Sequence, residues 1–276
     1  MMIRLIRRIK RKFVLFYNKL IFQHEPEFSG FYSSFEECDS KGNVWESDEW
    51  VNNQLKKIKG VNSVINQKKS KSFVHNTTHG TLLGSFITLI NLLCESQSKV
   101  KVVDFGGGTG ISYHSYVQNL IEPEKIYWKI IDNEMLAELG KKEINSKHDN
   151  IEYASSINDD EYDALIISST LHYIEDYRKI MKKLLKGNPN IVHFERLHAG
   201  AIPNNFVCFQ KYFNFYTPIM NLNIHEFNIF MNDNGYTLVY KANLDTENYS
   251  DKNFSNDIPK DYRIRYSLSL TYKKSL

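Results

Sequence analysis

The fold is decided by one stretch of the sequence, Val102-Val103-Asp104-Phe105-Gly106-Gly107-Gly108-Thr109-Gly110. This stretch reads as a buried strand that runs directly into a glycine-rich turn, and the turn opens a helix. Glycines let the backbone turn sharply and approach a ligand closely, and open α/β sheets bind ligands at the carboxyl ends of their strands. The stretch therefore predicts a nucleotide or nucleoside site, with a purely structural turn as the alternative.

Strand and helix patterns alternate along the chain from residue 98 onward. Apolar runs rich in β-branched residues, separated by helices of about ten residues, are typical of a parallel sheet covered on both faces. The predicted fold class is doubly wound α/β, and the last two strand patterns predict an antiparallel hairpin at the sheet edge. Expected strands are 100–104, 126–131, 151–153, 162–168, 190–194, 236–241 and 263–272, and expected helices are 111–121, 135–144, 174–185 and 224–232.

The first 97 residues differ in character from the rest. Residues 1–24 hold basic groups and no acid, and their apolar residues fall near one helical face. They predict a basic amphipathic helix, which either lies on an anionic membrane surface or packs on the protein or a second subunit. Residues 25–97 are less regular, with short helices expected at 47–58 and 82–94. We interpret them as an N-terminal lobe over a ligand-binding domain at 98–276.

Charge and cysteine content argue against several classes of function. The formal net charge is +3, but residues 25–276 are slightly acidic, which disfavours a nucleic-acid-binding surface. Cys38, Cys94 and Cys208 lie far apart, so neither a disulfide framework nor a zinc site is indicated, and a reducing cytoplasm fits best. No run of about 18 apolar residues is present, and the start does not resemble a cleaved signal peptide. We expect a cytoplasmic protein.

Details of the glycine stretch narrow the expected ligand. A dinucleotide fingerprint laid on Gly106 and Gly108 puts Ile111 at the third glycine position, which disfavours NAD. A phosphate-binding P-loop is excluded because no Lys-Ser or Lys-Thr follows the glycines. Instead, Asp104 precedes the first glycine and Asp132 ends the next strand. A carboxylate at the second place can accept both hydroxyls of an unphosphorylated ribose.

The D-x-G-x-G-x-G pattern, followed by an acid that ends the second strand, resembles the class I S-adenosylmethionine-dependent methyltransferases. That resemblance implies a seven-stranded sheet with a reversed edge strand. A narrower resemblance spans roughly residues 28–272, and it rests on Phe28–Glu37, the glycine stretch, the run Ser168–Asp176, Glu195-Arg196-Leu197, Gln210 and Gly235-Tyr236. These segments are similar to a family of predicted methyltransferases encoded among bacterial surface-polysaccharide genes.

The resemblance implies S-adenosylmethionine as cofactor and assigns its contacts. Gly106, Gly108 and Gly110 would shape the turn against the methionine and ribose parts, and Asp132 would bind the ribose. Asp104 would order the turn and reach the amino group, with simple bracing of the loop as the alternative. Ser155 would lie near adenine, although serines at strand ends are common turn residues. Ser168 and Ser169 would lie at the methionine side.

Transfer of a methyl group to a hydroxyl requires that the hydroxyl proton be removed. His172 is the first candidate for this general base, because histidine titrates near neutral pH. In the alternative, His172 is a structural residue that forms a hydrogen bond to its own loop. Glu195 is the second candidate, and Arg196 is its ion-pair partner or an anchor for an acidic sugar. Tyr113, His114 and His198 are further candidates on the acceptor side. No motif fixes two metal ligands on one face, so we expect no metal.

The sequence thus predicts an S-adenosylmethionine-dependent methyltransferase that methylates a sugar hydroxyl of a surface glycan or its precursor. The N-terminal lobe and residues 199–225 would cover the acceptor, and residues 1–24 could hold the enzyme at the inner membrane face. Two alternatives stay open. One is a non-catalytic scaffold with the same fold in a polysaccharide assembly complex. The other is a nicotinamide-dependent sugar oxidoreductase, which Ile111 disfavours.

Overall fold

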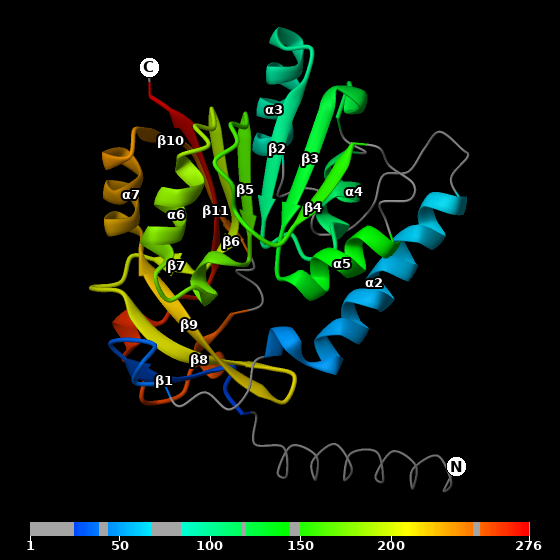
Figure 1. Ribbon diagram of the computed structural model, residues 1–276. Helices are drawn as coiled ribbons and strands as arrows, with labels where there is room; N and C mark the ends of the chain where they lie inside the picture. Colours follow the sequence, from blue (N-terminus) through cyan, green and yellow to red (C-terminus); the bar gives the residue numbers. More distant parts are fainter. Residues whose placement is uncertain are drawn as a thin grey trace, which may run out of the picture.

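A seven-stranded sheet forms the centre of the computed structural model (Figure 1). The structure describes residues 25–38, 44–67, 84–117, 120–143, 150–244 and 249–275, so the predicted basic helix at 1–24 lies outside the described residues. The strands, in their order across the sheet, are β10 (Tyr236–Leu244), β11 (Ser267–Lys274), β6 (Ile191–Leu197), β5 (Ala164–Ser168), β2 (Val100–Phe105), β3 (Ile126–Ile131) and β4 (Ile151–Ala154).

The strand directions confirm the predicted fold class. Strands β6, β5, β2, β3 and β4 are parallel, whereas β11 is antiparallel to both β6 and β10. The chain therefore ends in the expected antiparallel edge hairpin. In register, Asp104 of β2 lies opposite Ile130 of β3 and Ile166 of β5. The carboxyl ends of these three strands consequently meet at one edge of the sheet, and that edge carries the glycine turn.

Neighbouring residues along each strand point to opposite faces of the sheet, and helices bury the apolar side chains on both faces. Val103 packs with α6 (Tyr177–Leu185) and α7 (Ile224–Asp233) on one face, and Val102 packs with α3 (Gly84–Ser96) and α4 (Ile111–Val117) on the other. Figure 1 shows α6 and α7 together on one side of the sheet. The helices are α2 (Asp48–Gln67), α3 (Gly84–Ser96), α4 (Ile111–Val117), α5 (Glu134–Glu143), α6 (Tyr177–Leu185) and α7 (Ile224–Asp233).

Three predicted helices have different boundaries in the structure. The expected helix at 174–185 begins only at Tyr177, because Asp176 caps its first turn by accepting the Lys179 N–H at 3.0 Å. The expected helix at 111–121 is described only to Val117, and Ile121 instead donates its N–H to Asn91 of α3 at 3.0 Å. The short helix expected at 47–58 extends to Gln67.

A second, four-stranded sheet was not predicted from the sequence. It has the order β1 (Phe28–Tyr32), β8 (Phe206–Tyr212), β9 (Phe215–Asn223) and β7 (Ala199–Gly200), and we call it the small sheet. Strand β1 comes from the N-terminal lobe and pairs with β8, Phe28 lying opposite Gln210. In Figure 1 the small sheet lies beyond the carboxyl ends of the central strands. The lobe and residues 199–225 therefore build one shared structure over that edge.

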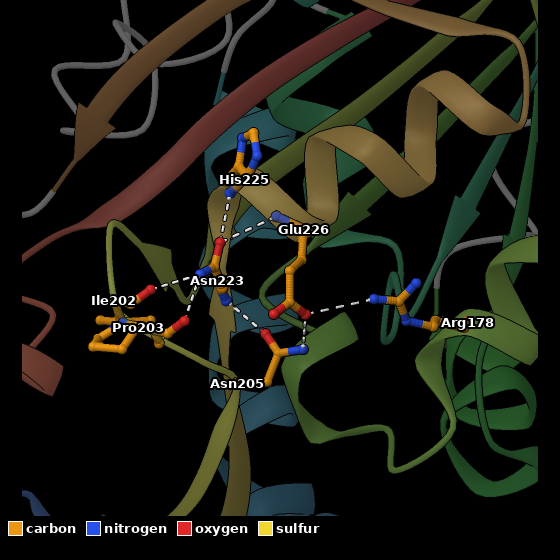
Figure 2. A network of polar contacts seen from close by, with 7 residues as sticks. All are labelled: Arg178, Ile202, Pro203, Asn205, Asn223, His225 and Glu226. Carbon is orange, nitrogen blue, oxygen red and sulfur yellow. Dashed lines mark hydrogen bonds and ion pairs between the residues drawn. The ribbon is translucent and has the colours of Figure 1, made fainter.

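A polar network fastens the small sheet to the helical layer (Figure 2). Asn223, the last residue of β9, caps α7 by accepting the N–H groups of His225 and Glu226 at 2.8 and 3.1 Å. Its side-chain amide donates to the carbonyl of Ile202 at 2.6 Å. Asn205 donates to the Glu226 carboxylate at 3.0 Å, and Arg178 of α6 approaches the same carboxylate at 3.8 Å. The end of β9 is thus held at several points.

Candidate functional site

The turn after β2 adopts a backbone that only glycine accepts without strain. Gly106, Gly108 and Gly110 have φ of +74°, +60° and +82°, in the left-handed region. A Cβ on Gly106 would lie 2.1 Å from Oγ1 of Thr170, which follows β5. A Cβ on Gly107 would lie 2.5 Å from Cγ of Asp104. The turn therefore packs tightly against β5 on one side and against the Asp104 carboxyl beneath it.

Asp132 follows β3 and faces the glycine turn. Its Oδ2 accepts the Gly108 N–H at 2.7 Å, and its Oδ1 accepts the Asn133 N–H at 2.7 Å. Burial raises the pKa of Asp132, and these two hydrogen bonds oppose that shift. A carboxylate offers about four lone-pair sites, so the two backbone contacts leave acceptor capacity for a ligand. The predicted ribose-binding residue therefore lies beside the turn with oxygens that can accept further bonds.

Asp104 lies underneath the turn and is completely buried. Its Oδ2 accepts the Trp128 indole N–H at 3.3 Å, and its Oδ1 has no hydrogen-bond partner among the described residues. Burial raises the pKa of Asp104 to about 7, against the lowering effect of the Trp128 hydrogen bond. The side chain thus supports the turn from below, and its contact with a cofactor amino group stays a prediction.

A cavity of about 620 Å³ opens at the carboxyl ends of the central strands. Its size is typical of small-molecule sites. Of the predicted cofactor residues, those on its wall are Gly106, Gly108, Asp132, Ser168 and Ser169. Gly110 lies behind the wall, close to Tyr153, and Ser155 lies exposed after β4. Residues from β2, β3 and β5 are therefore brought together in one cavity, whereas these two residues are not part of its lining.

His172 lies in the short 3-10 helix η4 (Leu171–Tyr173) after β5 and lines the cavity. It is 6% exposed, and its Nδ1 has no hydrogen-bond partner among the described residues. Burial lowers the pKa of His172 well below its ordinary value, and nearby His198 adds to the shift. The imidazole is consequently neutral at neutral pH, and one of its ring nitrogens is a hydrogen-bond acceptor.

His198 is the second buried histidine on the cavity wall, with its ring centroid 6.0 Å from that of His172. It stacks on Phe28 of β1 at 5.0 Å. Burial lowers the pKa of His198 to about 4, and a hydrogen bond with the Asn221 side chain opposes part of this shift. Two neutral imidazoles with bonding capacity thus lie at the end of the cavity that the small sheet covers.

The structure places Glu195 behind the cavity wall. Its Oε2 accepts the hydroxyl groups of Tyr116 and Ser168 at 3.1 and 3.4 Å, and the residue is 5% exposed. Arg196, the next residue along β6, lines the cavity instead. Glu195 therefore contacts Ser168 from within the protein. Of the other candidates, Tyr113 is buried and donates to Asn150 at 3.0 Å, and the side chain of His114 lies outside the described residues.

An aromatic wall, which sequence reasoning did not assign to the site, lines the rest of the cavity. Trp45, in the 3-10 helix η1 (Val44–Glu46), has its ring centroid 4.9 Å from that of Trp50 and 4.6 Å from that of Tyr173. Trp50 lies 5.7 Å from Tyr212 of β8. Lys57, Gln210 and Tyr249 also line the cavity. The concentration of aromatics in residues 28–50 was the available signal, but it does not say what these residues face.

Three further properties concern the described part of the chain only. None of the described helices is both long and apolar enough to span a membrane. Within the same residues, no group of three or more His, Cys, Asp or Glu side chains is arranged to hold a metal ion. The three cysteines are buried free thiols.

Comparison with known proteins supports the fold alone. No protein-family model and no curated protein matches this sequence. A predicted sarcosine dimethylglycine methyltransferase from Galdieria sulphuraria is 10% identical, with 71% of this chain and 85% of that chain covered and a TM-score of 0.50. Magnesium protoporphyrin IX methyltransferase from Synechocystis, solved with bound S-adenosylmethionine, is 12% identical, with coverage of 85% and 100% and a TM-score of 0.45. The chain has the fold of the class I S-adenosylmethionine-dependent methyltransferases.

Proposed function

We propose that the chain is an S-adenosylmethionine-dependent methyltransferase. The observation that carries this proposal is the glycine turn beside Asp132 at the wall of a 620 Å³ cavity. The turn follows β2, which has β3 on one side and β5 on the other. The strand order reverses at this point, and open α/β sheets bind their ligands there.

The residues of this part of the cavity fit a nucleoside with an unphosphorylated ribose. Asp132 would supply the carboxylate for the ribose hydroxyls, and the turn is open beside it, because a Cβ on Gly108 would meet only Gln54 Oε1 at 3.9 Å. Ile111 begins α4 where a dinucleotide site needs a third glycine. Gly106, Gly108, Asp132, Ser168 and Ser169 would hold the cofactor, which when bound supplies a reactive methyl group on a sulfonium.

The acceptor is proposed to be a hydroxyl group, with His172 as the general base. His172 is neutral, lines the cavity, and has a ring nitrogen with free bonding capacity among the described residues. Such a nitrogen can take the proton as the oxygen gains its methyl group. Glu195 supports Ser168 from behind, and so it orients the wall near the reacting groups.

The finer identity of the acceptor is proposed from the sequence resemblance and the aromatic wall. Sugar rings pack on the faces of Trp and Tyr side chains because both present apolar surface. A sugar hydroxyl of a surface glycan or its precursor is therefore the proposed acceptor. Residues 1–24 are proposed to hold the enzyme at the inner membrane face, where their basic groups favour anionic lipid.

Calorimetric titration of the full chain with S-adenosylmethionine, S-adenosylhomocysteine and NAD tests the proposal. We expect the two adenosyl ligands to bind with micromolar affinity, or about −8 kcal/mol. Asp132→Asn should weaken them at least tenfold, since charged hydrogen bonds contribute about 1.5–3 kcal/mol. Glu134→Gln, on the exposed first turn of α5, is the matched control. Binding of NAD in their place, or no adenosyl binding to the folded wild-type chain, would overturn the proposal.

A further inference from the structure

The charges on the cavity wall are unequally divided. Among the described residues that line it, Asp132 is the one carboxylate, and Lys57 and Arg196 are the two permanent cations. Asp132 belongs to the cofactor side, next to the glycine turn. Lys57 comes from α2 and Arg196 from the end of β6, beyond β5. The positive charge therefore lies on elements that do not carry the predicted cofactor contacts.

Lys57 and Arg196 face the same space. The Lys57 ammonium lies 5.7 Å from the centroid of the Trp50 ring, which is part of the aromatic wall. Partial burial lowers the pKa of Lys57, and the Arg196 guanidinium lowers it further. Arg196 has φ of +53°, an uncommon conformation for a side-chain-bearing residue. Both side chains line the same cavity, so an anion bound there would be attracted by each of the two positive charges.

The cofactor itself is a poor match for this pair of cations. S-adenosylmethionine carries a sulfonium, an ammonium and one carboxylate, so its net charge at neutral pH is positive. Positive charges on the cavity wall favour an anionic ligand over a second positively charged one. The buried His172 and His198 line the same cavity as Lys57 and Arg196, and both imidazoles are neutral at neutral pH.

We infer that the methyl acceptor is an anion, a hydroxylated molecule whose carboxylate or phosphate binds between Lys57 and Arg196 while its ring packs on Trp45 and Trp50. This inference rests on the proposed function and adds the charge class of the substrate. In this arrangement the hydroxyl to be methylated lies toward His172, and the negative group of the acceptor offsets the positive charge of the cofactor. Phosphate and carboxylate share this chemistry, and arginine binds both in a two-pronged manner.

Intrinsic fluorescence gives a direct test, because two of the three tryptophans line the cavity. The full chain, first titrated with S-adenosylhomocysteine and then kept saturated with it, is titrated with glucuronate, glucose 1-phosphate and glucose. The first two probes carry a carboxylate and a phosphate, and glucose is the neutral control. The variants are Lys57→Gln, Lys57→Arg, which keeps the charge, and Lys56→Gln, a neighbouring exposed lysine that does not line the cavity.

We expect saturable binding of at least one charged sugar and none of glucose in the same range. Lys57→Gln should weaken that binding about tenfold, the loss of one charge-assisted hydrogen bond. Lys57→Arg and Lys56→Gln should stay within about twofold of the wild type. S-adenosylhomocysteine should bind all four proteins alike.

Three results would overturn the inference while leaving the proposed function intact. They are failure of both charged sugars to bind, equal binding of glucose, and a Lys57→Gln defect in S-adenosylhomocysteine binding as large as the defect for the sugar. The last result would indicate that Lys57 and Arg196 bind the carboxylate of the cofactor and not the acceptor. Failure of S-adenosylhomocysteine to bind the wild-type chain, read in the first titration, would instead remove the proposed function and this inference with it.

Discussion

The two ends of the cavity are built in different ways. At the end where we propose that the cofactor binds, the turn after β2 and Asp132 after β3 come from neighbouring parallel strands, and the Gly108 N–H donates to the Asp132 carboxylate. At the other end, where we propose that the acceptor binds, side chains from η4, β6, α2 and the small sheet converge from distant parts of the chain. The first end suits a constant ligand. The second can change its specificity through side chains without disturbing the sheet.

The largest expected effect separates catalysis from cofactor binding. His172→Gln should lower the rate of methyl transfer by about 10²- to 10⁴-fold, because the general base is lost. S-adenosylhomocysteine should bind as it does to the wild type, since the contacts of the cofactor end remain. The measurement is turnover with a charged sugar that binds the cavity, beside calorimetry. His225→Gln, on the exposed side of α7, is the control, and an unchanged rate in His172→Gln would remove the residue from the reaction.

A substitution in the glycine turn should impair cofactor binding and therefore methyl transfer. Gly106→Ala puts a Cβ 2.1 Å from Thr170 Oγ1 in a backbone with φ of +74°. We expect S-adenosylhomocysteine to bind about a hundredfold more weakly, which corresponds to about 2.7 kcal/mol. Gly84→Ala is the matched control, because a Cβ there meets nothing within 4 Å. Tight cofactor binding by Gly106→Ala would show that the turn can move away from β5.

Two buried groups, His198 and Asp104 beneath the glycine turn, should change the free energy of unfolding with pH in opposite directions. Burial lowers the pKa of His198 to about 4. The unfolded chain therefore binds more protons between this value and the ordinary value of about 6.5, and stability falls as the pH drops through that window. Burial raises the pKa of Asp104 from 3.8 to about 7. Here the folded chain binds more protons, and stability falls as the pH rises through that second window.

Denaturant unfolding at about pH 5 and about pH 6 measures both contributions, each about 1.4 kcal/mol per pH unit when fully expressed. In His198→Gln, the free energy of unfolding should rise less steeply with pH than in the wild type, by about 1.4 kcal/mol per pH unit. In Asp104→Asn, it should rise more steeply than in the wild type, by a similar amount. Slopes that change in the same direction in the two variants would contradict the opposed titration of the two ends.

The smallest expected effect tests whether the ends are mechanically separate. Asn223→Ala removes the cap of α7 and the bonds to the loop at Ile202 (Figure 2), so the free energy of unfolding should fall by about 1–2 kcal/mol. Cofactor binding should stay within about twofold of the wild type. Chemical denaturation and calorimetry measure the two quantities, with Asn232→Ala, exposed on the same helix, as control. A large loss of cofactor affinity would show that the two ends move together.

Sequence reasoning reached the fold of the central sheet because each strand there has a local signature. The run Val102–Gly110 and the acid at Asp132 mark neighbouring strand ends, and parallel pairing brings them together without further information. The small sheet lacks such a signature. Strand β1 is short, and its partner β8 is far away in the sequence, so its pairing depends on tertiary contacts that no local pattern encodes.

The same contrast between local patterns and tertiary contacts explains which site residues could be predicted from the sequence. His172 follows a strand that was predicted, so its place near the cavity could be anticipated. Glu195 and Arg196 are neighbours on β6, and only the three-dimensional backbone decides that Arg196 reaches the cavity while Glu195 bonds to Tyr116. Lys57 and Trp50 belong to α2, whose packing over the cavity is a tertiary property.

The pairing of β1 with β8 also orders events during synthesis. Phe28 lies opposite Gln210, so the first of these strands leaves the ribosome well before its partner exists. At about 5–20 residues per second, this wait lasts roughly ten to forty seconds. Strands β2 to β5 can pair during that interval, whereas the small sheet must form later. The chain can therefore assemble the proposed pocket for the methyl donor before the surface that we propose selects the recipient.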